Sequence, residues 1–129
     1  LDGLKFGFSF ATLVLSIKNI SYHKDFTKRI LSMKRQKKLA VGKVLLENDI
    51  TRITEWSFSG YGDNTGWHEH GCDYSVIPMF SGILEIDDGK TISKSKLELG
   101  KPYFRGKGVK HDVINGNEFA CSFIEVEYL

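Results

Sequence analysis

From Leu39 to Leu129 the chain consists of short alternating segments separated by turn residues, with no convincing helix among them. Within 50–59, for example, Thr54, Trp56 and Phe58 alternate with the residues between them, as in a β-strand with one buried face. Pairs of residues that favour turns separate the segments: Asn48-Asp49, Asp88-Gly89 and Asn115-Gly116. The last two pairs are typical of two-residue hairpin loops. About eight short strands without a helix predict a β-sandwich or a closed β-barrel.

Residues 1–38 differ from the rest in charge, so we place a domain boundary near Leu39. They contain nine Lys and Arg against two Asp, a net charge of +7, whereas residues 39–129 contain nine against fourteen Asp and Glu, a net charge of −5. A basic run of this kind can bind nucleic acid. Because no aromatic residues are interleaved with the run, we expect no nucleic-acid partner.

Apolar residues in this N-terminal extension follow two different periods. Alternation in its first part predicts a strand that contains Phe6, Phe8 and Phe10. Helical spacing over residues 25–38 predicts a helix that contains Phe26, Ile30 and Met33. An apolar strand rarely stays exposed, so we expect the extension to pack on the barrel or on a second subunit, and the protein to form a homodimer.

Two histidines, His68 and His70, are separated by a single residue. In a β-strand successive side chains point to opposite faces, so both imidazoles project from one face and Glu69 from the other. Two such rings can bind one metal ion, although the same spacing is also common among surface and core histidines. Of the other histidines, His23 lies in the basic segment and reads as a surface residue, whereas His111 lies in a second glycine-rich stretch. The candidate metal ligands are therefore His68, His70 and His111.

The residues around these histidines follow two spaced patterns: Gly62-x5-His68-x-His70-x4-Ser75-x6-Gly82 and Gly100-x5-Gly106-x-Gly108-x2-His111-x3-Asn115. They resemble, in the right order, the two signatures of the cupin superfamily, with Ser75 in the place of a glutamate and Gly106 in the place of a proline. The stretches T-G-W-H-E-H-G-C-D-Y-S-V-I-P and P-Y-F-R-G-K-G-V-K-H-D-V-I-N are similar to small single-domain cupins of the beta-alanine degradation group, in which the glutamate is missing as a rule.

This resemblance covers roughly residues 39–129 and implies an all-β fold, a small cupin-type (double-stranded β-helix or jelly-roll) barrel, with residues 1–38 as an N-terminal extension. Three neutral imidazoles would hold a divalent transition metal, Fe, Zn, Ni or Mn, and leave positions open for water and a small anionic substrate. Oxygen-activating cupins with three histidines make a dioxygenase the first candidate, and isomerase or decarboxylase chemistry follows. The alternative is a non-catalytic module that senses or binds a ligand.

Three further residues are candidates for binding the substrate. Arg105 has a planar guanidinium that suits a carboxylate, although a surface arginine is an equally good interpretation. Tyr103 either lines the pocket or fills the barrel. Without the cupin glutamate, either Tyr74 or Asp73 is placed to approach the metal. In an unbroken strand Tyr74 shares the histidine face, and a turn at Gly71 would reverse this assignment.

The remaining signals concern compartment and core. Cys72 and Cys121 have no framework spacing, so we interpret them as free thiols in a reducing compartment, the cytoplasm. No run reaches the roughly 18 apolar residues that span a bilayer, so we expect no membrane partner. A secretory signal is the less favoured interpretation of the apolar run between Lys5 and Lys18. For Trp67, packing in the core is the preferred interpretation.

Overall fold

The computed structural model describes residues 20–28, 30 and 35–129, and the chain divides into two compact units, residues 1–34 and 35–129. Residues 20–28 are helical, and His23 among them is exposed, as predicted. The helix predicted over residues 25–38 is wrong at its end, because residues 35–38 are not helical. The strand predicted around Phe8 lies outside the described residues. None of the helical residues that the structure describes belongs to a segment long and apolar enough to cross a membrane.

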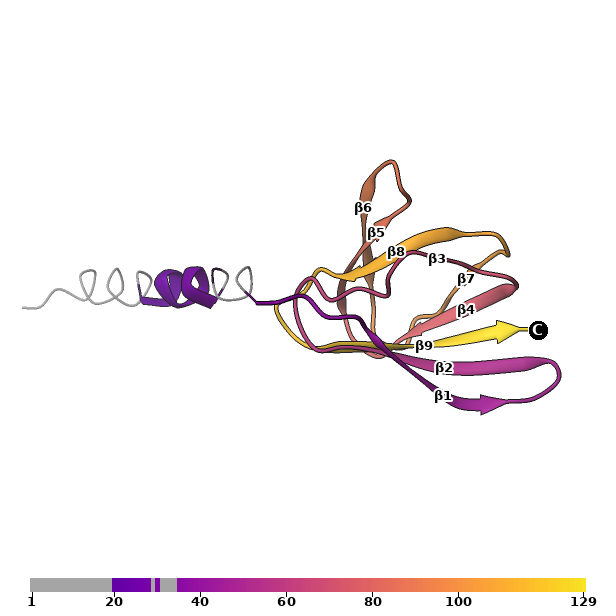
Figure 1. Cartoon of the computed structure of the whole chain (residues 1–129). Coiled ribbons are helices and arrows are strands. Elements are labelled where there is room, and N and C mark those ends of the chain that lie inside the picture. Colours follow the sequence, from indigo (N-terminus) through magenta and orange to yellow (C-terminus); the bar gives the residue numbers. More distant parts are fainter. Residues whose placement is uncertain (1–19, 29, 31–34) are drawn as a thin grey trace, which may run out of the picture. The chain divides into compact units, whose positions relative to one another are not determined.

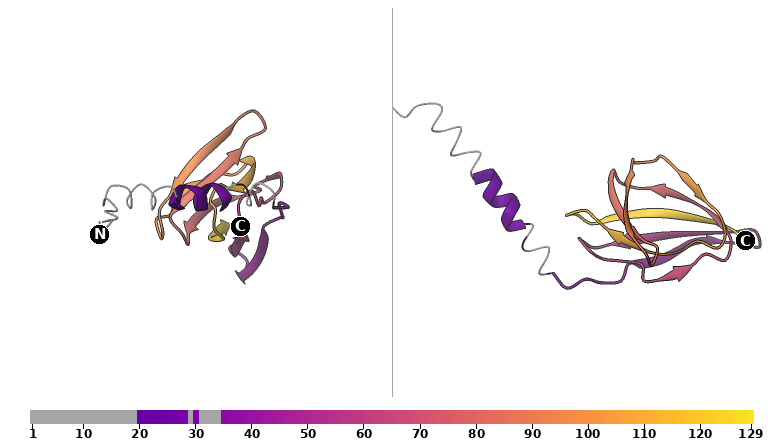
Figure 2. Two further views of the ribbon diagram at one scale, coloured as in Figure 1. Left: turned by 90° about the vertical axis from the view of Figure 1, so that its left-hand side faces the viewer. Right: turned by 90° about the horizontal axis from the view of Figure 1, so that it is seen from above.

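Residues 35–129 form an antiparallel β-structure, as the alternating segments predicted. Its strands are β1 (Val41–Glu47), β2 (Thr51–Phe58), β3 (His68–Glu69), β4 (Asp73–Pro78), β5 (Gly82–Asp87), β6 (Ile92–Leu97), β7 (Tyr103–Arg105), β8 (Lys110–Asn115) and β9 (Cys121–Tyr128). One sheet has the order β1-β2-β9-β4-β7 and the other has the order β3-β8-β5-β6. Figures 1 and 2 show the two sheets facing one another.

The core lies between the two sheets and is built from alternate residues of their strands. On β4, Tyr74 and Val76 are buried, whereas Asp73 is exposed. On β9, Cys121 and Phe123 are buried in the same way. The buried apolar cluster contains Phe58, Tyr74, Val76, Phe80, Leu84, Leu97, Val113, Cys121 and Phe123. Both cysteines are free thiols, as predicted.

Two of the predicted turns differ from the two-residue hairpin. The loop between β5 and β6 spans residues 88–91, where only Gly89 has a positive φ and the Asp88 carboxylate accepts hydrogen bonds from the amides of Lys90 and Thr91. The pair Asn115-Gly116 does not close a hairpin, because β8 and β9 belong to different sheets. The Asn115 side chain is buried and donates to the carbonyls of Gly60 and Phe119, which fixes the crossing instead.

The loop that leads to β3 is fixed by the carboxylate of Asp63. This side chain is 1% exposed and accepts hydrogen bonds from both terminal nitrogens of Arg35, at 2.6 and 3.0 Å. It also accepts from the backbone amides of Lys38, Ser59 and Gly60. These contacts hold residues 35–38 against the loop of residues 59–67, which leads to His68.

Candidate metal centre

Backbone pairing brings the three predicted histidines together at one end of the smaller sheet. His68 on β3 is the register partner of His111 on β8. His70 follows β3 directly, and its backbone bonds to the carbonyl of Val109 and the amide of Gly108 hold it beside the same strand. His68 and His111, which are 43 positions apart in the sequence, are therefore neighbours in the smaller sheet.

The three imidazoles point their Nε2 atoms at one another. The Nε2 atom of His70 lies 3.1 Å from that of His68 and 3.1 Å from that of His111. The ring centroids are 4.7 to 5.1 Å apart. Three nitrogens that each bind one tetrahedral ion at ~2.1 Å are about 3.4 Å apart, so the observed spacing fits a three-histidine metal site.

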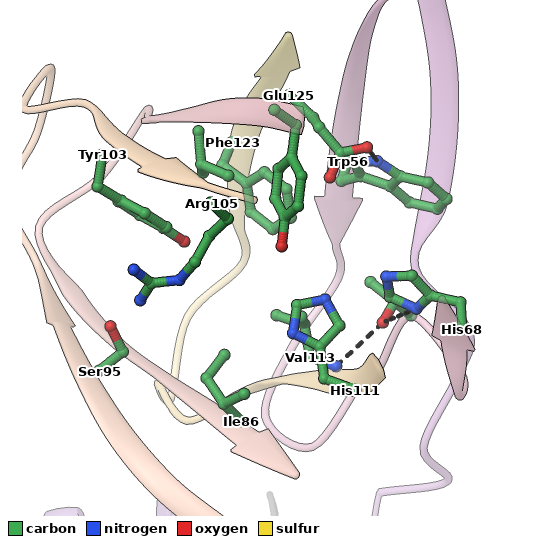
Figure 3. Close-up of a pocket in the computed structure, with 13 residues that line it drawn as sticks. Trp56, His68, Ile86, Ser95, Tyr103, Arg105, His111, Val113, Phe123 and Glu125 are labelled. Carbon is green, nitrogen blue, oxygen red and sulfur yellow. Dashed lines mark hydrogen bonds between the residues drawn. The ribbon is translucent and has the colours of Figure 1, made fainter. Parts of the chain in front are cut away.

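A backbone contact orients the first of these rings. His68 Nδ1 lies 2.8 Å from the carbonyl oxygen of Gly66 and 3.4 Å from Thr65 Oγ1, the second contact being drawn in Figure 3. An Nδ1–H that donates to a carbonyl leaves the lone pair on Nε2 free. The nitrogen that faces the other two rings is therefore the one that can bind a metal ion.

The other two rings are buried, His70 at 5% exposure and His111 at 9%. Burial, reinforced by the neighbouring His68 and His111, lowers the pKa of His70 to about 4. Burial, with the charges of His68 and Arg105, likewise lowers the pKa of His111 to about 4. Both imidazoles are neutral at pH 7, and the neutral form is the one that binds a metal.

A cavity of about 50 Å³ opens beside the histidines. One water needs about 10–15 Å³ of such space, so the cavity holds a few waters or a molecule of a few non-hydrogen atoms. Figure 3 draws the side chains around it. They are Trp56, Thr65, His68, Tyr74, Val76, Ile86, Ser95, Tyr103, Arg105, His111, Val113, Phe123 and Glu125.

Tyr74, not Asp73, approaches the histidines, which decides the open question about strand parity. The Tyr74 ring stacks on His70 with centroids 3.7 Å apart. Asp73 is exposed and accepts from the Lys107 amide, and the Ser75 hydroxyl bonds to Tyr128. Ser75 therefore lies away from the centre, although it occupies the sequence position of the cupin glutamate.

The hydroxyl of Tyr74 is buried and has no hydrogen-bond partner among the described residues. Burial, together with the charge of Glu125, raises the pKa of this hydroxyl, so Tyr74 keeps its proton at pH 7. Buried polar groups are nearly always paired. An unpaired donor that lines a cavity is therefore available to a bound ligand.

Arg105 and Tyr103 form one wall of the cavity. The Arg105 guanidinium carbon lies 4.9 Å from the centroid of the Tyr103 ring. Arg105 is exposed on one side yet lines the cavity, and Tyr103 is partly buried. The structure thus places both predicted residues beside the histidine centre.

The sequence analysis did not identify Glu125, the acidic residue that lines the cavity, and it misplaced Trp67. Glu125 on β9 is 7% exposed and accepts a hydrogen bond from the Trp56 indole at 3.3 Å. Its signal was the alternation of Cys121 and Phe123, which continues to Glu125 on the same face. Trp67 is not a core residue, because it is 55% exposed and lies over the turn glycine Gly89.

Comparison with known proteins agrees with this architecture. No family model matches the chain. The beta-alanine degradation protein BauB of Pseudomonas aeruginosa PAO1 is 39% identical to it over 88 residues, which cover 68% of this chain and 92% of BauB. At this identity and coverage, the two proteins belong to one family.

Solved structures also resemble the fold of this chain. A cupin domain from Bordetella pertussis Tohama I is 36% identical, with a TM-score of 0.70 over 74% of this chain and 98% of that chain. An RmlC-like cupin with a double-stranded β-helix fold from Methanocaldococcus jannaschii is 19% identical, with a TM-score of 0.57 over 74% of this chain and 84% of that chain, and shows likeness of fold alone. The chain therefore belongs to the cupin superfamily and to the group of small cupins that includes BauB.

Proposed function

We propose that this cupin binds a divalent transition metal through His68, His70 and His111 and acts there on a small anionic metabolite. The observation that carries the proposal is the convergence of three Nε2 atoms, with separations of 3.1 Å on either side of His70. Of the predicted metals Fe, Zn, Ni and Mn, imidazole nitrogens suit Fe, Zn and Ni best. Two of the rings are held neutral by burial, so little proton competition opposes binding near pH 7.

The remaining cavity residues favour an anion. A metal bound by neutral imidazoles keeps its positive charge, attracts anions and lowers the pKa of a bound water. Arg105 adds a second positive charge with a planar fork that matches a carboxylate. Tyr74 offers an unpaired hydroxyl, and Tyr103 lies beside the guanidinium. BauB is named for the degradation of β-alanine, and a small amino-acid metabolite belongs to this class of ligand.

Metal analysis separates the candidate activities. We expect about one metal ion per chain in protein purified without a histidine tag, measured by inductively coupled plasma mass spectrometry. Iron would support a dioxygenase, the first activity to test, because oxygen-activating cupins with three histidines exist. Zinc or nickel would support hydrolytic or isomerising chemistry. A chain without metal that still binds a ligand would contradict the proposal and support the non-catalytic sensing module.

We further propose that the protein works as a homodimer in a reducing compartment such as the cytoplasm, where its two free thiols would persist. Strand β1 lies at the edge of its sheet and is exposed along its whole length. Its apolar residues include Val41 at 67% exposure and Val44 at 52%. An exposed apolar edge strand readily pairs with another chain, and a second copy would cover this one.

The dimer proposal predicts that a charge on the edge strand separates the subunits. Val44→Lys should convert a wild-type dimer into a monomer in light scattering coupled to size exclusion, because the new charge would be desolvated in the interface. Ile92→Lys on β6, the edge of the other sheet and 60% exposed, is the matched control and should leave the dimer intact. A monomeric wild-type protein, or a dimer that persists in Val44→Lys, would contradict the proposal.

A further inference from the structure

Glu125 is a buried acid that the three-histidine site does not require. It projects from β9 into the cavity at 7% exposure. Within residues 35–129 no cation lies within ion-pair distance of it, and its one hydrogen bond is the long contact of 3.3 Å from the Trp56 indole. The nearby carboxylate of Glu127 repels it further. The fold therefore keeps an acid in an apolar place with almost nothing to pair it.

Such an arrangement is costly for folding. A buried carboxyl without a counter-charge either loses its proton at a high free-energy cost or stays protonated. Burial accordingly raises the pKa of Glu125 to about 7, partly offset by the Trp56 hydrogen bond. A glutamine or a leucine at this position of β9 would fill a similar volume without burying an ionisable group. A buried ionisable group that destabilises the fold and lines a cavity is a candidate for binding a ligand.

The cavity has two poles of opposite charge. Figure 3 shows Arg105 beside Tyr103 and Glu125 beside Trp56. The Glu125 pole is walled by aromatic rings, whose faces attract a cation. A carboxylate oxygen of Glu125 also lies within 4.8 Å of a ring nitrogen of His70. A ligand that spans from the histidine centre to Glu125 is therefore only a few atoms long.

We propose that Glu125 determines specificity by binding the cationic end of a short ammonio-carboxylate, whose carboxylate end lies at the histidine centre and Arg105. This inference rests on the proposed function and adds to it the second half of the ligand. The ammonium group supplies the counter-charge and the hydrogen bonds that Glu125 lacks in the protein. Trp56 holds the carboxyl and, with Tyr74, contributes aromatic surface to the same pole.

The test uses three ligands of the same length: β-alanine, which carries both charges, propanoate and propylamine. Their affinities for the metal-loaded full chain are measured by isothermal titration calorimetry at pH 8. We expect β-alanine to bind at least about tenfold more tightly than either single-charge ligand, because a tenfold ratio is ~1.4 kcal/mol, which one hydrogen bond to a charged group can supply.

The variant Glu125→Gln keeps the shape of the side chain and removes its charge. It should bind β-alanine and propanoate about equally, with the metal content and the propanoate affinity close to wild type. Glu98→Gln changes the same charge at an exposed site and should keep the tenfold preference. Arg105→Met should weaken propanoate as much as β-alanine, which separates the two poles.

The inference is overturned if the wild-type protein binds propanoate as tightly as β-alanine, or if Glu125→Gln keeps the preference. It is also overturned if the protein holds its metal but binds none of the three ligands, while the metal centre of the proposed function would stand. Loss of metal from the wild-type protein under these conditions would instead remove the proposed function itself, and the inference with it.

Discussion

Replacing Asp63 by Asn is expected to lower the free energy of unfolding by roughly 3 kcal/mol, because breaking a buried ion pair leaves donors without their acceptor. The carboxylate accepts from Arg35 at 2.6 and 3.0 Å and from three backbone amides. An asparagine of the same size offers only one acceptor oxygen and turns an NH₂ group toward some of these donors. Urea unfolding followed by tryptophan fluorescence measures the change.

The same residue predicts how stability depends on pH. Burial alone would raise the pKa of Asp63, but the hydrogen bonds from Arg35, Lys38 and Ser59 hold it well below its usual range. A folded-state pKa below the unfolded value near ~3.9 gives stability that is complete above that pH and is lost as the pH falls further. Asp63→Asn should therefore flatten the loss of stability below about pH 4.

A matched change elsewhere should have little effect. Asp49→Asn lies in the exposed turn before β2 and should alter stability by less than about 0.5 kcal/mol. Arg35→Met should destabilise in the same direction as Asp63→Asn, and the double variant should lose less than the sum of the two. Additive effects of the two changes would show that the ion pair contributes nothing to folding.

Local sequence signals predicted much of the sheet structure, because alternation and turn residues act over a few positions. The alternation within 50–59 corresponds to strand β2, Thr51–Phe58, and the turn at Asn48 closes through its own side chain, which accepts hydrogen bonds from the amides of Ile50 and Thr51. The signal at Asn115-Gly116 failed because it marks a crossing between sheets, fixed by hydrogen bonds to Gly60, 55 positions away. Such a contact leaves no trace in the neighbouring residues.

The sequence predicted those residues of the site that belong to a spaced motif or to a strand with clear alternation. The three histidines stand in spaced glycine motifs, and Tyr74 follows from parity once the chain is known to keep its face past Gly71. Glu125 needed a different argument, namely that a charged residue continues the buried face of Cys121 and Phe123. Which residues pair across the cavity depends on the packing of two sheets, and alternation within one strand does not determine it.

The largest effect on ligand binding is expected from the histidines themselves. Removal of an outer-shell partner typically costs 10–100-fold in metal affinity, so loss of a direct ligand should cost more than about 100-fold. His68→Ala, His70→Ala and His111→Ala should each lose the metal, because each takes away one of three Nε2 atoms that converge on one point. Calorimetric titration of metal-stripped protein, with circular dichroism to verify the fold, measures the change.

Two control variants, one at a hydroxyl and one at a carboxylate, test whether the three histidines are the complete ligand set. Ser75→Ala should be nearly silent, because its hydroxyl bonds to Tyr128 and lies away from the centre. Glu69→Gln should also keep the metal, since Glu69 is exposed and pairs with Lys110 at 3.5 Å. If Glu69→Gln lost the metal while His111→Ala retained it, the ion would have to lie on the outer face of β3. That outcome would contradict the convergence of the His68, His70 and His111 rings, and the metal would need a different ligand set.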